Sequence, residues 1–528
     1  MNSLFLAIIG LILFGLGYRF YASYISTKIY SLQDFTGDVP AKEFQDGIDF
    51  VPTKKGILFG HHFTSIAGAA PIIGPCIAAF WGWLPAMLWI VLGTIFMGAV
   101  HDFGALVVSV REKGKTIADI TGTIINKRVK TMFLIFVMML SWLVLAVFAM
   151  AIAGLFVSIP TAVLPVNIEI IIALAVGFLL YRKKVDALIP SIIALILLYV
   201  FVYIGSFTPL SFEAIGMDKA SQSTLWIILL FIYSGIASLL PVWLLLQPRD
   251  YINSHQLIVG LALIFMGIAI AQPVVEAPMI RSAGEGVPSL FPLLFVTIAC
   301  GAISGFHGLV ASGTTSKQVS NIQDTKMIGY GSMLGEGTLA LASTIAAVAG
   351  ISLVTNCNLP SIGAVDNLNW NIYYDTWAHA STNKATAFVL GGGALIQSLG
   401  IPQTLAKTIM AVLVISFAAT TLDTATRIQR FIITEVGQTI DIPLLKNRYI
   451  STFVAILPAL ALTLWNVTDP VTGESTQAGW VLWPIFGASN QMLAALTLMV
   501  LSIYFWKKNK PVLPLVIPFV FITITTLT

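Results

Sequence analysis

The chain has 528 residues, of which 57% are hydrophobic and only 10% charged, and its mean hydropathy is +0.90. A soluble domain carries about 25% charged residues because its exterior faces water, so this composition predicts an integral membrane protein and excludes a soluble enzyme, a nucleic-acid binder and a disordered scaffold. The net charge of +4 is too small to indicate an acidic partner, and the three cysteines are too few for a disulfide framework.

Apolar runs long enough to cross about 30 Å of hydrocarbon recur along the whole chain, without the strict alternation of a β-barrel. The first run, Leu4 to Leu16, lacks the flanks of a cleavable signal peptide and is expected to remain as a span. We therefore expect an all-α integral membrane protein with fourteen transmembrane helices, near residues 4–22, 57–80, 84–110, 131–157, 166–181, 187–207, 225–246, 255–273, 290–315, 329–350, 404–422, 450–467, 479–506 and 511–527.

Basic residues cluster in alternate loops, which predicts the orientation because cytoplasmic loops retain Lys and Arg. Lys28, Lys42, Lys54 and Lys55 follow the first span, whereas no basic residue follows the second, and the alternation continues along the chain. This pattern places the N-terminus outside.

Two segments of the second half do not read as simple spans. Residues 385–401 are apolar but contain three consecutive glycines, so we expect an interfacial or re-entrant helix on the outside. Residues 351–384 carry Trp370 and Trp377 and are expected to form an outer segment, either a plain connecting loop or an external lid.

Glycines and prolines predict interrupted helices at mid-membrane, where freed backbone groups and half-helix ends can hold a substrate. The second span contains GHHFTSIAGAAPIIGP at residues 60–75, and the seventh has small residues before Pro241. Because Pro removes a backbone donor, neither is expected to form a continuous helix. The alternative is that Gly and Pro are simply commoner in membrane helices. The candidate substrate-binding residues are Ser65, Gly68, Ala69, Ser234, Ser238, Trp243 and His307.

The two predicted interruptions are five spans apart, so the spans that carry them run in opposite directions. This arrangement is typical of the LeuT-type fold, whose core consists of two inverted repeats of five helices. We expect an extra helix and a cytoplasmic loop in 1–56, the first repeat in 57–207, the second repeat in 225–422 and extra helices in 423–528.

A cluster of hydroxyl groups at the cytoplasmic end of the ninth span suggests a cation site, since hydroxyl and carbonyl oxygens are hard ligands. The candidates are Ser312, Thr314, Thr315 and Ser316, together with the backbone near Ser65 to Gly68. Alternatively, these hydroxyls bond to their own helix carbonyls. The neighbouring Lys317 would repel a cation there and would favour proton coupling.

Ionisable residues inside spans are functional candidates because a charge in the bilayer costs about 3 kcal/mol on insertion scales. Glu336, flanked by Gly335 and Gly337, is the clearest and is predicted to carry the coupling proton or to pair with a substrate ammonium group or Lys317. His61, His62 and His307 are either proton carriers or plain hydrogen-bonding partners. His101 and Asp102 are expected to make capping or gating contacts, and the spacing of Asp423 and Arg427 is typical of a surface helix pair.

Several long motifs resemble those of the bacterial carbon starvation protein A family. They are GHHFTSIAGAAPIIGP, GAVHDF, LPVWLLLQPRDY, SGFHGLVASGTTSKQ, YGSMLGEG, FAATTLDTATRIQR and FGASNQMLAALTL. The resemblance covers about residues 1–510 and implies a multispanning inner-membrane transporter of the amino acid/polyamine/cation superfamily that is linked to peptide uptake during carbon limitation. Some members of that family resemble proton-coupled pyruvate permeases.

We therefore predict a secondary active importer of short peptides in the bacterial inner membrane, driven by a proton or sodium gradient. A pyruvate symporter is the alternative within the same class, and a channel or a membrane-embedded metal enzyme is the alternative outside it. We expect no catalytic residues, no cofactor, no metal beyond a sodium ion, and no partner other than the substrate and the lipid bilayer. The sequence sets neither the coupling ion nor the oligomeric state.

Overall fold

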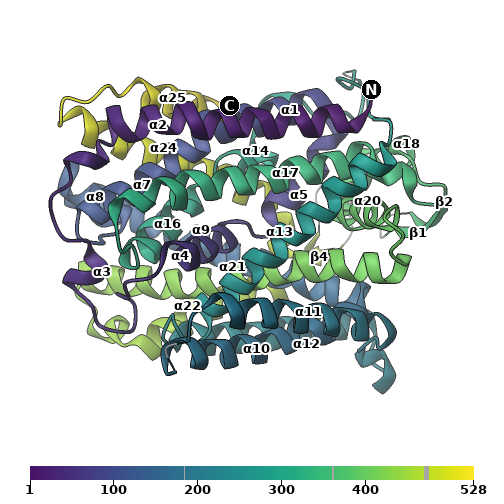
Figure 1. Cartoon of the computed structure of the whole chain (residues 1–528), viewed down its shortest axis with the longest axis horizontal. Helices are drawn as coiled ribbons and strands as arrows, with labels where there is room; N and C mark the ends of the chain where they lie inside the picture. The colour runs from purple at the N-terminus through teal and green to yellow at the C-terminus, as the bar shows by residue number, and fades with distance from the viewer. Residues whose placement is uncertain (184, 283, 360–361, 384, 469–474) are drawn as a thin grey trace.

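Long helices that run side by side along one axis make up most of the molecule, with two short hairpins (Figure 1). The computed structural model describes residues 1–183, 185–282, 284–359, 362–383, 385–468 and 475–528. Within these residues nine helical segments are long and apolar enough to cross a membrane, or ten if the bent pair α4 and α5 counts as one span. The prediction of a multispanning helical membrane protein is therefore confirmed.

The first half of the chain supplies the N-terminal helix, a bent pair and a series of long helices. Their bounds are α1 Ser3–Leu16, α2 Ala22–Tyr24, α3 Pro40–Glu43, α4 Lys55–Ile66, α5 Ala70–Ala78, α6 Trp83–Gly93, α7 Ala99–Arg111, α8 Ile117–Ile124, α9 Lys127–Ser158, α10 Val163–Tyr181, α11 Leu188–Phe207, α12 Lys219–Leu239 and α13 Leu246–Ala271.

The second half contains more short helices and both hairpins. Their bounds are α14 Leu290–Thr297, α15 Ala299–Ala302, α16 Gly305–Gly313, α17 Ser332–Val348, β1 Asn356–Leu359, β2 Gly363–Asp366, α18 Trp370–Tyr373, α19 Trp377–Asn383, α20 Thr386–Gln397, α21 Gln403–Thr439, α22 Arg448–Leu464, β3 Asn466–Thr468, β4 Ser475–Gln477, α23 Ala478–Val481, α24 Trp483–Trp506 and α25 Leu513–Leu527. Both hairpins are antiparallel, with Asn356 opposite Asp366 and Asn466 opposite Gln477.

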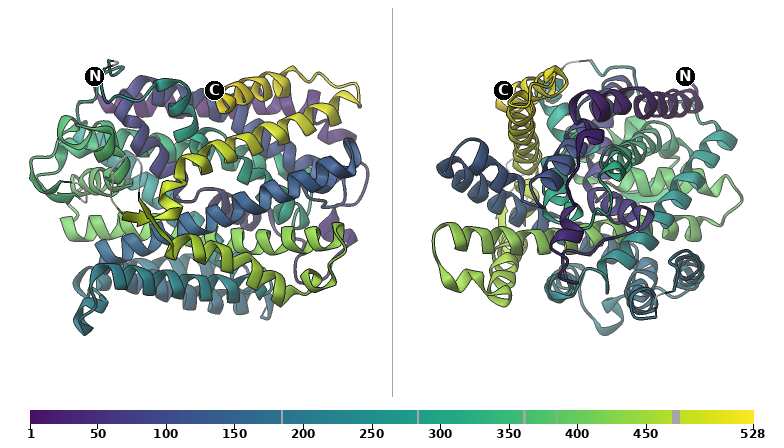
Figure 2. Two further views of the ribbon diagram at one scale, coloured as in Figure 1. Left: turned by 180° about the vertical axis from the view of Figure 1, so that it is seen from behind. Right: turned by 60° about the vertical axis from the view of Figure 1, so that its left-hand side comes forward.

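The helices enclose α21, which is buried along almost its whole length. Helices α1 and α25 cover one side of the bundle, and α10, α11 and α12 cover the opposite side (Figures 1 and 2). The outer faces of these covering helices expose large apolar side chains, for example Phe5, Ile189 and Ile517, as a lipid-facing surface requires.

The predicted interruption of the second span is confirmed. Helix α4 ends at Ile66, α5 begins at Ala70, and the two axes differ by 47°. Pro71 lies in the first turn of α5, where its missing donor costs nothing, while its ring could not continue α4.

The predicted interruption of the seventh span is wrong, because α12 runs unbroken to Leu239 and Pro241 lies in the connection between α12 and α13. The second interrupted span is instead the ninth. It is divided into α14, α15 and α16, with extended backbone at Ile303 and Ser304. The pairing of the two repeats rested on interruptions in both the second and the seventh span, and the seventh span has none.

The two interrupted spans lie against each other and run in opposite directions. A Cβ atom added to Gly74 would lie 2.3 Å from the backbone oxygen of Thr297, so the chains touch there. Farther along, His62 of α4 bonds to Thr315, just beyond α16. Residue numbers thus rise along one span as they fall along the other. The close approach at Gly74 is possible only because glycine has no side chain.

Loops that the basic residues predict to be cytoplasmic gather at one end of the bundle, on the left of Figure 1. Ion pairs connect them: Lys54 to Asp186 at 2.8 Å, Arg427 to Asp49 at 3.1 Å and Lys510 to Asp34 at 3.4 Å. We call this the basic end. The other end carries Trp81, Trp370 and Trp377 and is called the aromatic end.

Helix α20 corresponds to the segment for which we expected a re-entrant or interfacial position. Its 12 residues extend about 18 Å, well short of the roughly 30 Å of hydrocarbon. It is buried at the aromatic end, where a Cβ on Gly391 would lie 2.3 Å from the backbone oxygen of Ala346 in α17.

We expect Gly74→Ala to destabilise the protein by about 1–3 kcal/mol, because the added methyl group must push the two interrupted spans apart. The measurement is thermal unfolding in detergent. Gly154→Ala in α9 is the matched control, since no atom lies within 4 Å of its added Cβ and Ala is a better helix former by roughly 1 kcal/mol. Equal melting temperatures for the two variants would contradict the close contact.

Candidate functional site

A cluster of four buried ionisable side chains joins the interrupted ninth span to α7 and α17. It consists of His101 and Asp102 from α7, His307 from α16 and Glu336 from α17, and none is more than 1% exposed. We call it the relay cluster. Since charges are costly at membrane depth, four ionisable groups in contact there indicate a functional site.

The contacts form a chain through Asp102 and His307. Nδ1 of His101 lies 2.7 Å from one oxygen of Asp102, and Nδ1 of His307 lies 2.9 Å from the other. Nε2 of His307 lies 3.2 Å from Oε2 of Glu336. His307 is thus held between two carboxyl groups.

A neutral imidazole carries one N–H, so it can donate to only one of two flanking carboxylates. Both contacts are favourable if His307 is an imidazolium or if one of the two carboxyl groups, Asp102 or Glu336, is protonated. The contact between His307 and Glu336 has the distance of an ion pair but not the geometry of a hydrogen bond. The relay cluster therefore places three groups that can each hold one proton in contact.

Glycines allow the helices around the relay cluster to approach closely. A Cβ on Gly308 would lie 3.1 Å from Cε1 of His101, and a Cβ on Gly335 would lie 2.6 Å from the Phe63 ring. The glycines beside Glu336 therefore admit neighbouring side chains.

A second buried group of charges lies among α10, α12, α13 and α21. Arg249 donates from Nε to Glu169 at 3.3 Å and from Nη1 to the Tyr233 hydroxyl at 2.5 Å, and it also pairs with Asp423. Tyr233 donates to Asp423 at 2.7 Å. We call these four residues the arginine cluster. Two carboxylates on one guanidinium leave it without excess positive charge.

The prediction that Asp423 and Arg427 form a surface pair is wrong, because both side chains are buried. Asp423 binds Arg249 instead, and Arg427 binds Asp49 and the backbone oxygen of Ala237. The spacing along one helix could not reveal these partners, which come from distant parts of the chain.

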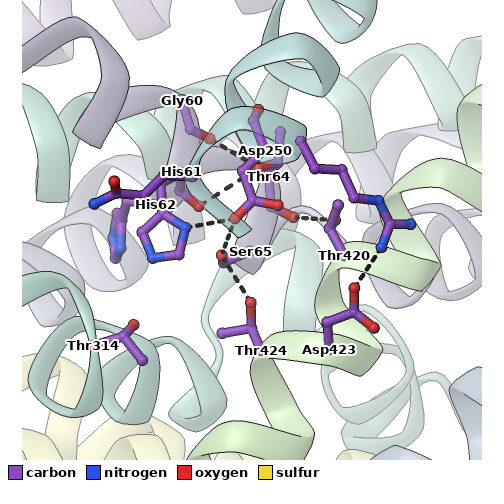
Figure 3. A network of polar contacts seen from close by, with 12 residues as sticks. Gly60, His61, His62, Thr64, Ser65, Asp250, Thr314, Thr420, Asp423 and Thr424 are labelled. Carbon is purple, nitrogen blue, oxygen red and sulfur yellow. Dashed lines mark hydrogen bonds and ion pairs between the residues drawn. The ribbon is translucent and has the colours of Figure 1, made fainter. Parts of the chain in front are cut away.

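The residues of α4 that precede the break in the second span contact α13 and α21 (Figure 3). His61 and Asp250 are joined at 2.5 Å, and Ser65 lies 3.4 Å from Asp250 and 3.2 Å from Thr424 of α21. Thr421 donates to the backbone oxygen of Ser65 at 3.3 Å. Hydroxyl groups of α21 thus donate hydrogen bonds to backbone oxygens near the break.

The structure brings some of the predicted site residues together and separates others. Ser65, Gly68 and Ala69 lie at the break and are buried, and His307 and Glu336 meet in the relay cluster. Ser234 and Ser238 donate to backbone oxygens of their own helix. The indole of Trp243 donates to the backbone oxygen of Gly47 at the basic end, away from the break.

The predicted hydroxyl cluster of the ninth span does not converge on the break. Ser312, Thr314 and Ser316 donate to backbone oxygens four residues earlier. Thr315 alone among the four contacts α4, through Nδ1 of His62 at 2.9 Å. The hydroxyls at the break come instead from α21, in the sequence AATTLDTAT at 418–426, and this was missed because nothing local marks α21 as the partner of α4.

A cavity of about 400 Å³ leads from the aromatic end to the two interrupted spans. Its floor includes Ala70, the first residue of α5, and Cys300 of α15. Trp377 of α19 and Trp483 of α24 contribute to its walls. Segment 351–384, which we expected to be a loop or a lid, therefore supplies part of the wall.

The floor of the cavity connects to the relay cluster through a buried amide. Asn490 of α24 donates to the Cys300 thiol at 3.1 Å and to the Ser304 hydroxyl at 2.9 Å, and it accepts the backbone N–H of Phe306 at 2.9 Å. Ser304 immediately precedes α16, and His307 lies one turn into that helix. A change at the cavity floor can thus displace His307.

The basic end is closed by contacts of segment 44–54. Backbone N–H of Thr53 donates to the carbonyl of Gln318 at 3.0 Å, Gln247 donates to the Thr53 hydroxyl at 2.9 Å, and Asp49 binds Arg427. The cavity thus lies toward the aromatic end, whereas contacts of segment 44–54 cover the basic end.

Comparison with known proteins identifies the family. The sequence matches the profile described as carbon starvation protein CstA over residues 2–528. The chain belongs to this family. The family resemblance predicted from the motifs is thus confirmed.

Family members with assigned names are similar to nearly the whole chain. A peptide transporter CstA of Helicobacter pylori is 31% identical, and the alignment covers 97% of this chain and 78% of that protein. A peptide transporter CstA of Campylobacter jejuni is 32% identical, with 100% and 80% covered. The pyruvate/proton symporter BtsT of Escherichia coli is 31% identical, with 100% and 81% covered.

One solved structure, a manganese transporter of Eremococcus coleocola, aligns with 91% of this chain and 96% of its own. Its identity is 12% and its TM-score 0.27, values too low to assign a shared fold.

We expect Arg249→Met to destabilise the protein by about 3–5 kcal/mol, because Glu169 and Asp423 would remain buried without a counter-charge. Thermal unfolding in detergent measures the effect. The triple variant Arg249→Met, Glu169→Gln, Asp423→Asn should recover much of the loss. Lys446→Met, which removes an exposed ion pair to Asp441, is the control and should change stability by less than about 1 kcal/mol.

Proposed function

We propose that this protein imports short peptides across the bacterial inner membrane and that proton binding in the relay cluster drives the import. Relatives named as peptide transporters cover nearly the whole chain, and BtsT is named a pyruvate/proton symporter. The observation that carries the coupling proposal is the position of His307 between Asp102 and Glu336, at 2.9 and 3.2 Å, where an additional proton would be favoured by both carboxyl groups.

The connection between cavity and relay cluster gives a route for coupling. A substrate at the floor, beside Cys300, contacts the element that precedes α16, and α16 carries His307. Moving α16 changes the distances from His307 to both carboxyl groups, and thus the affinity for the proton. By linkage, protonation then changes the affinity for the substrate by the same factor.

The arrangement of open and closed ends supports an alternating-access transporter. With the basic end in the cytoplasm, as the positive-inside rule predicts, the cavity opens outward and the N-terminus lies outside. The inner contacts of Asp49 with Arg427 and of Thr53 with Gln247 and Gln318 would have to break before a substrate could leave inward.

We further propose that fourteen segments cross the membrane: the nine long helical segments, the pair α4 and α5, the run from α14 to α16, and α17, α22 and α25. The break at Ser65, Gly68 and Ala69 would meet the substrate or ion. The LeuT-type plan, with repeats in 57–207 and 225–422, remains our proposal for the core, with its second interrupted helix at 290–313 rather than 225–246.

Pyruvate is the second candidate substrate, because BtsT is as similar to this chain as the peptide transporters are. Sodium is the alternative coupling ion, with Thr315, Ser65 and the α21 hydroxyls as ligands. Both alternatives are tested by uptake of a labelled dipeptide and of labelled pyruvate into proteoliposomes, with proton and sodium gradients imposed separately. Accumulation of the dipeptide under the proton gradient alone is expected, and accumulation of neither compound would exclude a transporter of either kind.

Glu336→Gln is expected to reduce proton-driven accumulation to the level of protein-free liposomes, because an amide cannot release the proton that His307 and Glu336 share. Exchange of internal for external substrate needs no net proton movement and should persist. Glu213→Gln, at an exposed position, is the control and should keep full accumulation. Unchanged accumulation by Glu336→Gln would contradict the role of the relay cluster.

A further inference from the structure

The walls of the cavity at the aromatic end carry aromatic rings and hydroxyl groups. Trp377 of α19 and Trp483 and Phe486 of α24 all line it. Hydroxyl side chains, among them Ser381, Thr382 and Thr476, line it as well. Among the lining residues that the structure describes, none carries a charge.

The lack of charged lining residues limits the net charge of a ligand. An isolated ion loses its hydration in an apolar cavity, and that loss is compensated only by an opposite charge nearby. Pyruvate is a monoanion and would enter without a cation beside it. A peptide with uncharged side chains has no net charge, but its ammonium and carboxylate groups each need a hydrogen-bonding partner in the cavity. The lack of charge on the described lining residues therefore argues chiefly against a further charge on the peptide side chains.

The size of the cavity also favours a peptide over a small acid. A volume of about 400 Å³ holds more than about ten water molecules, whereas pyruvate has only about six non-hydrogen atoms. Binding sites for larger organic ligands commonly measure about 300–1,000 Å³. Pyruvate would leave most of this apolar surface unfilled.

The aromatic walls are held in place by contacts behind them. Trp377 packs on Phe80 and Trp81, with ring centroids 5.3 and 4.9 Å apart, and Trp483 packs on Phe486 at 5.1 Å. Rings fixed in this way lose little entropy when an apolar group enters between them.

The segment before Trp377 is fastened to α5 and the turn that follows it. The Tyr374 hydroxyl donates to the backbone oxygen of Cys76 at 2.6 Å, and the Trp370 indole donates to that of Ala79 at 3.2 Å. Arg281 lies 4.0 Å from the Phe80 ring centre and donates to the backbone oxygen of Tyr374 at 2.7 Å. The Trp377 wall thus belongs to the same body as α5.

We propose that this cavity selects peptides whose side chains are apolar and uncharged, with Trp377, Trp483 and Phe486 supplying the aromatic surface that an apolar side chain contacts. The hydroxyl groups of Ser381, Thr382 and Thr476 bond to the peptide amides. This inference rests on the proposed function, and it adds the class of peptide and the residues that select it.

The test measures uptake of labelled dialanine into proteoliposomes and its inhibition by unlabelled dileucine, dilysine, diglutamate and pyruvate. Dileucine should inhibit at concentrations at least about tenfold below the other three, which is the effect of one good aromatic contact. Equal inhibition by dileucine and dilysine would overturn the inference while leaving peptide transport intact. Uptake of labelled pyruvate without uptake of dialanine would overturn the proposed function as well.

Variants assign the selectivity to the cavity. Trp483→Ala should raise the inhibitory concentration of dileucine about tenfold, while Trp506→Ala, on the same helix but 67% exposed, should leave it unchanged. Thr382→Asp places a negative charge on the wall and should improve inhibition by dilysine relative to diglutamate. If Trp483→Ala fails to fold, Phe486→Leu and Thr382→Asp still test whether the cavity selects the peptide. Unchanged inhibition in all folded variants would show that the peptide binds elsewhere.

Discussion

The cost of burying charge in a low-dielectric medium governs the interior of this protein. Arg249, Glu169, Asp423, Asp102, His307 and Glu336 are all buried in a bundle whose outer surface faces lipid. Each is held by an oppositely charged or hydrogen-bonding partner from another helix, because an unpaired charge there would cost several kcal/mol. The order in which the helices pack is therefore fixed in part by which charges must meet.

The two interrupted spans bring buried charges close to the cavity. Continuous helices would pair their backbone groups along their whole length, whereas the breaks near Ala67 and Ser304 interrupt that pairing inside the bundle. Ala70 and Cys300, close to the two breaks, both line the cavity. In the proposed mechanism, substrate binding and proton transfer at His307 involve the same short stretch of α15 and α16, so one movement would serve both.

Uncharged and charged regions are separated along the substrate path. The cavity presents aromatic rings and hydroxyls at the aromatic end, the relay cluster lies behind its floor, and the ion pairs of segment 44–54 close the basic end. In the proposed mechanism the substrate enters the first region and the proton binds in the second. Selection of the substrate and coupling to the ion would then depend on different side chains.

The sequence alone determined the membrane class, the approximate position of nearly every helix, the interruption within residues 60–75 and the presence of a charged residue, Glu336, inside a span, because hydropathy, proline and a charge in an apolar run act locally. Only the tertiary structure decided the partners: Asp423 with Arg249, Glu336 with His307, and α21 rather than the ninth span against the break in α4. It also moved the second break from Pro241 to Ser304, since a proline at the end of a helix and one within it look alike in sequence. Contacts between residues hundreds of positions apart depend on helix packing, which no local pattern encodes.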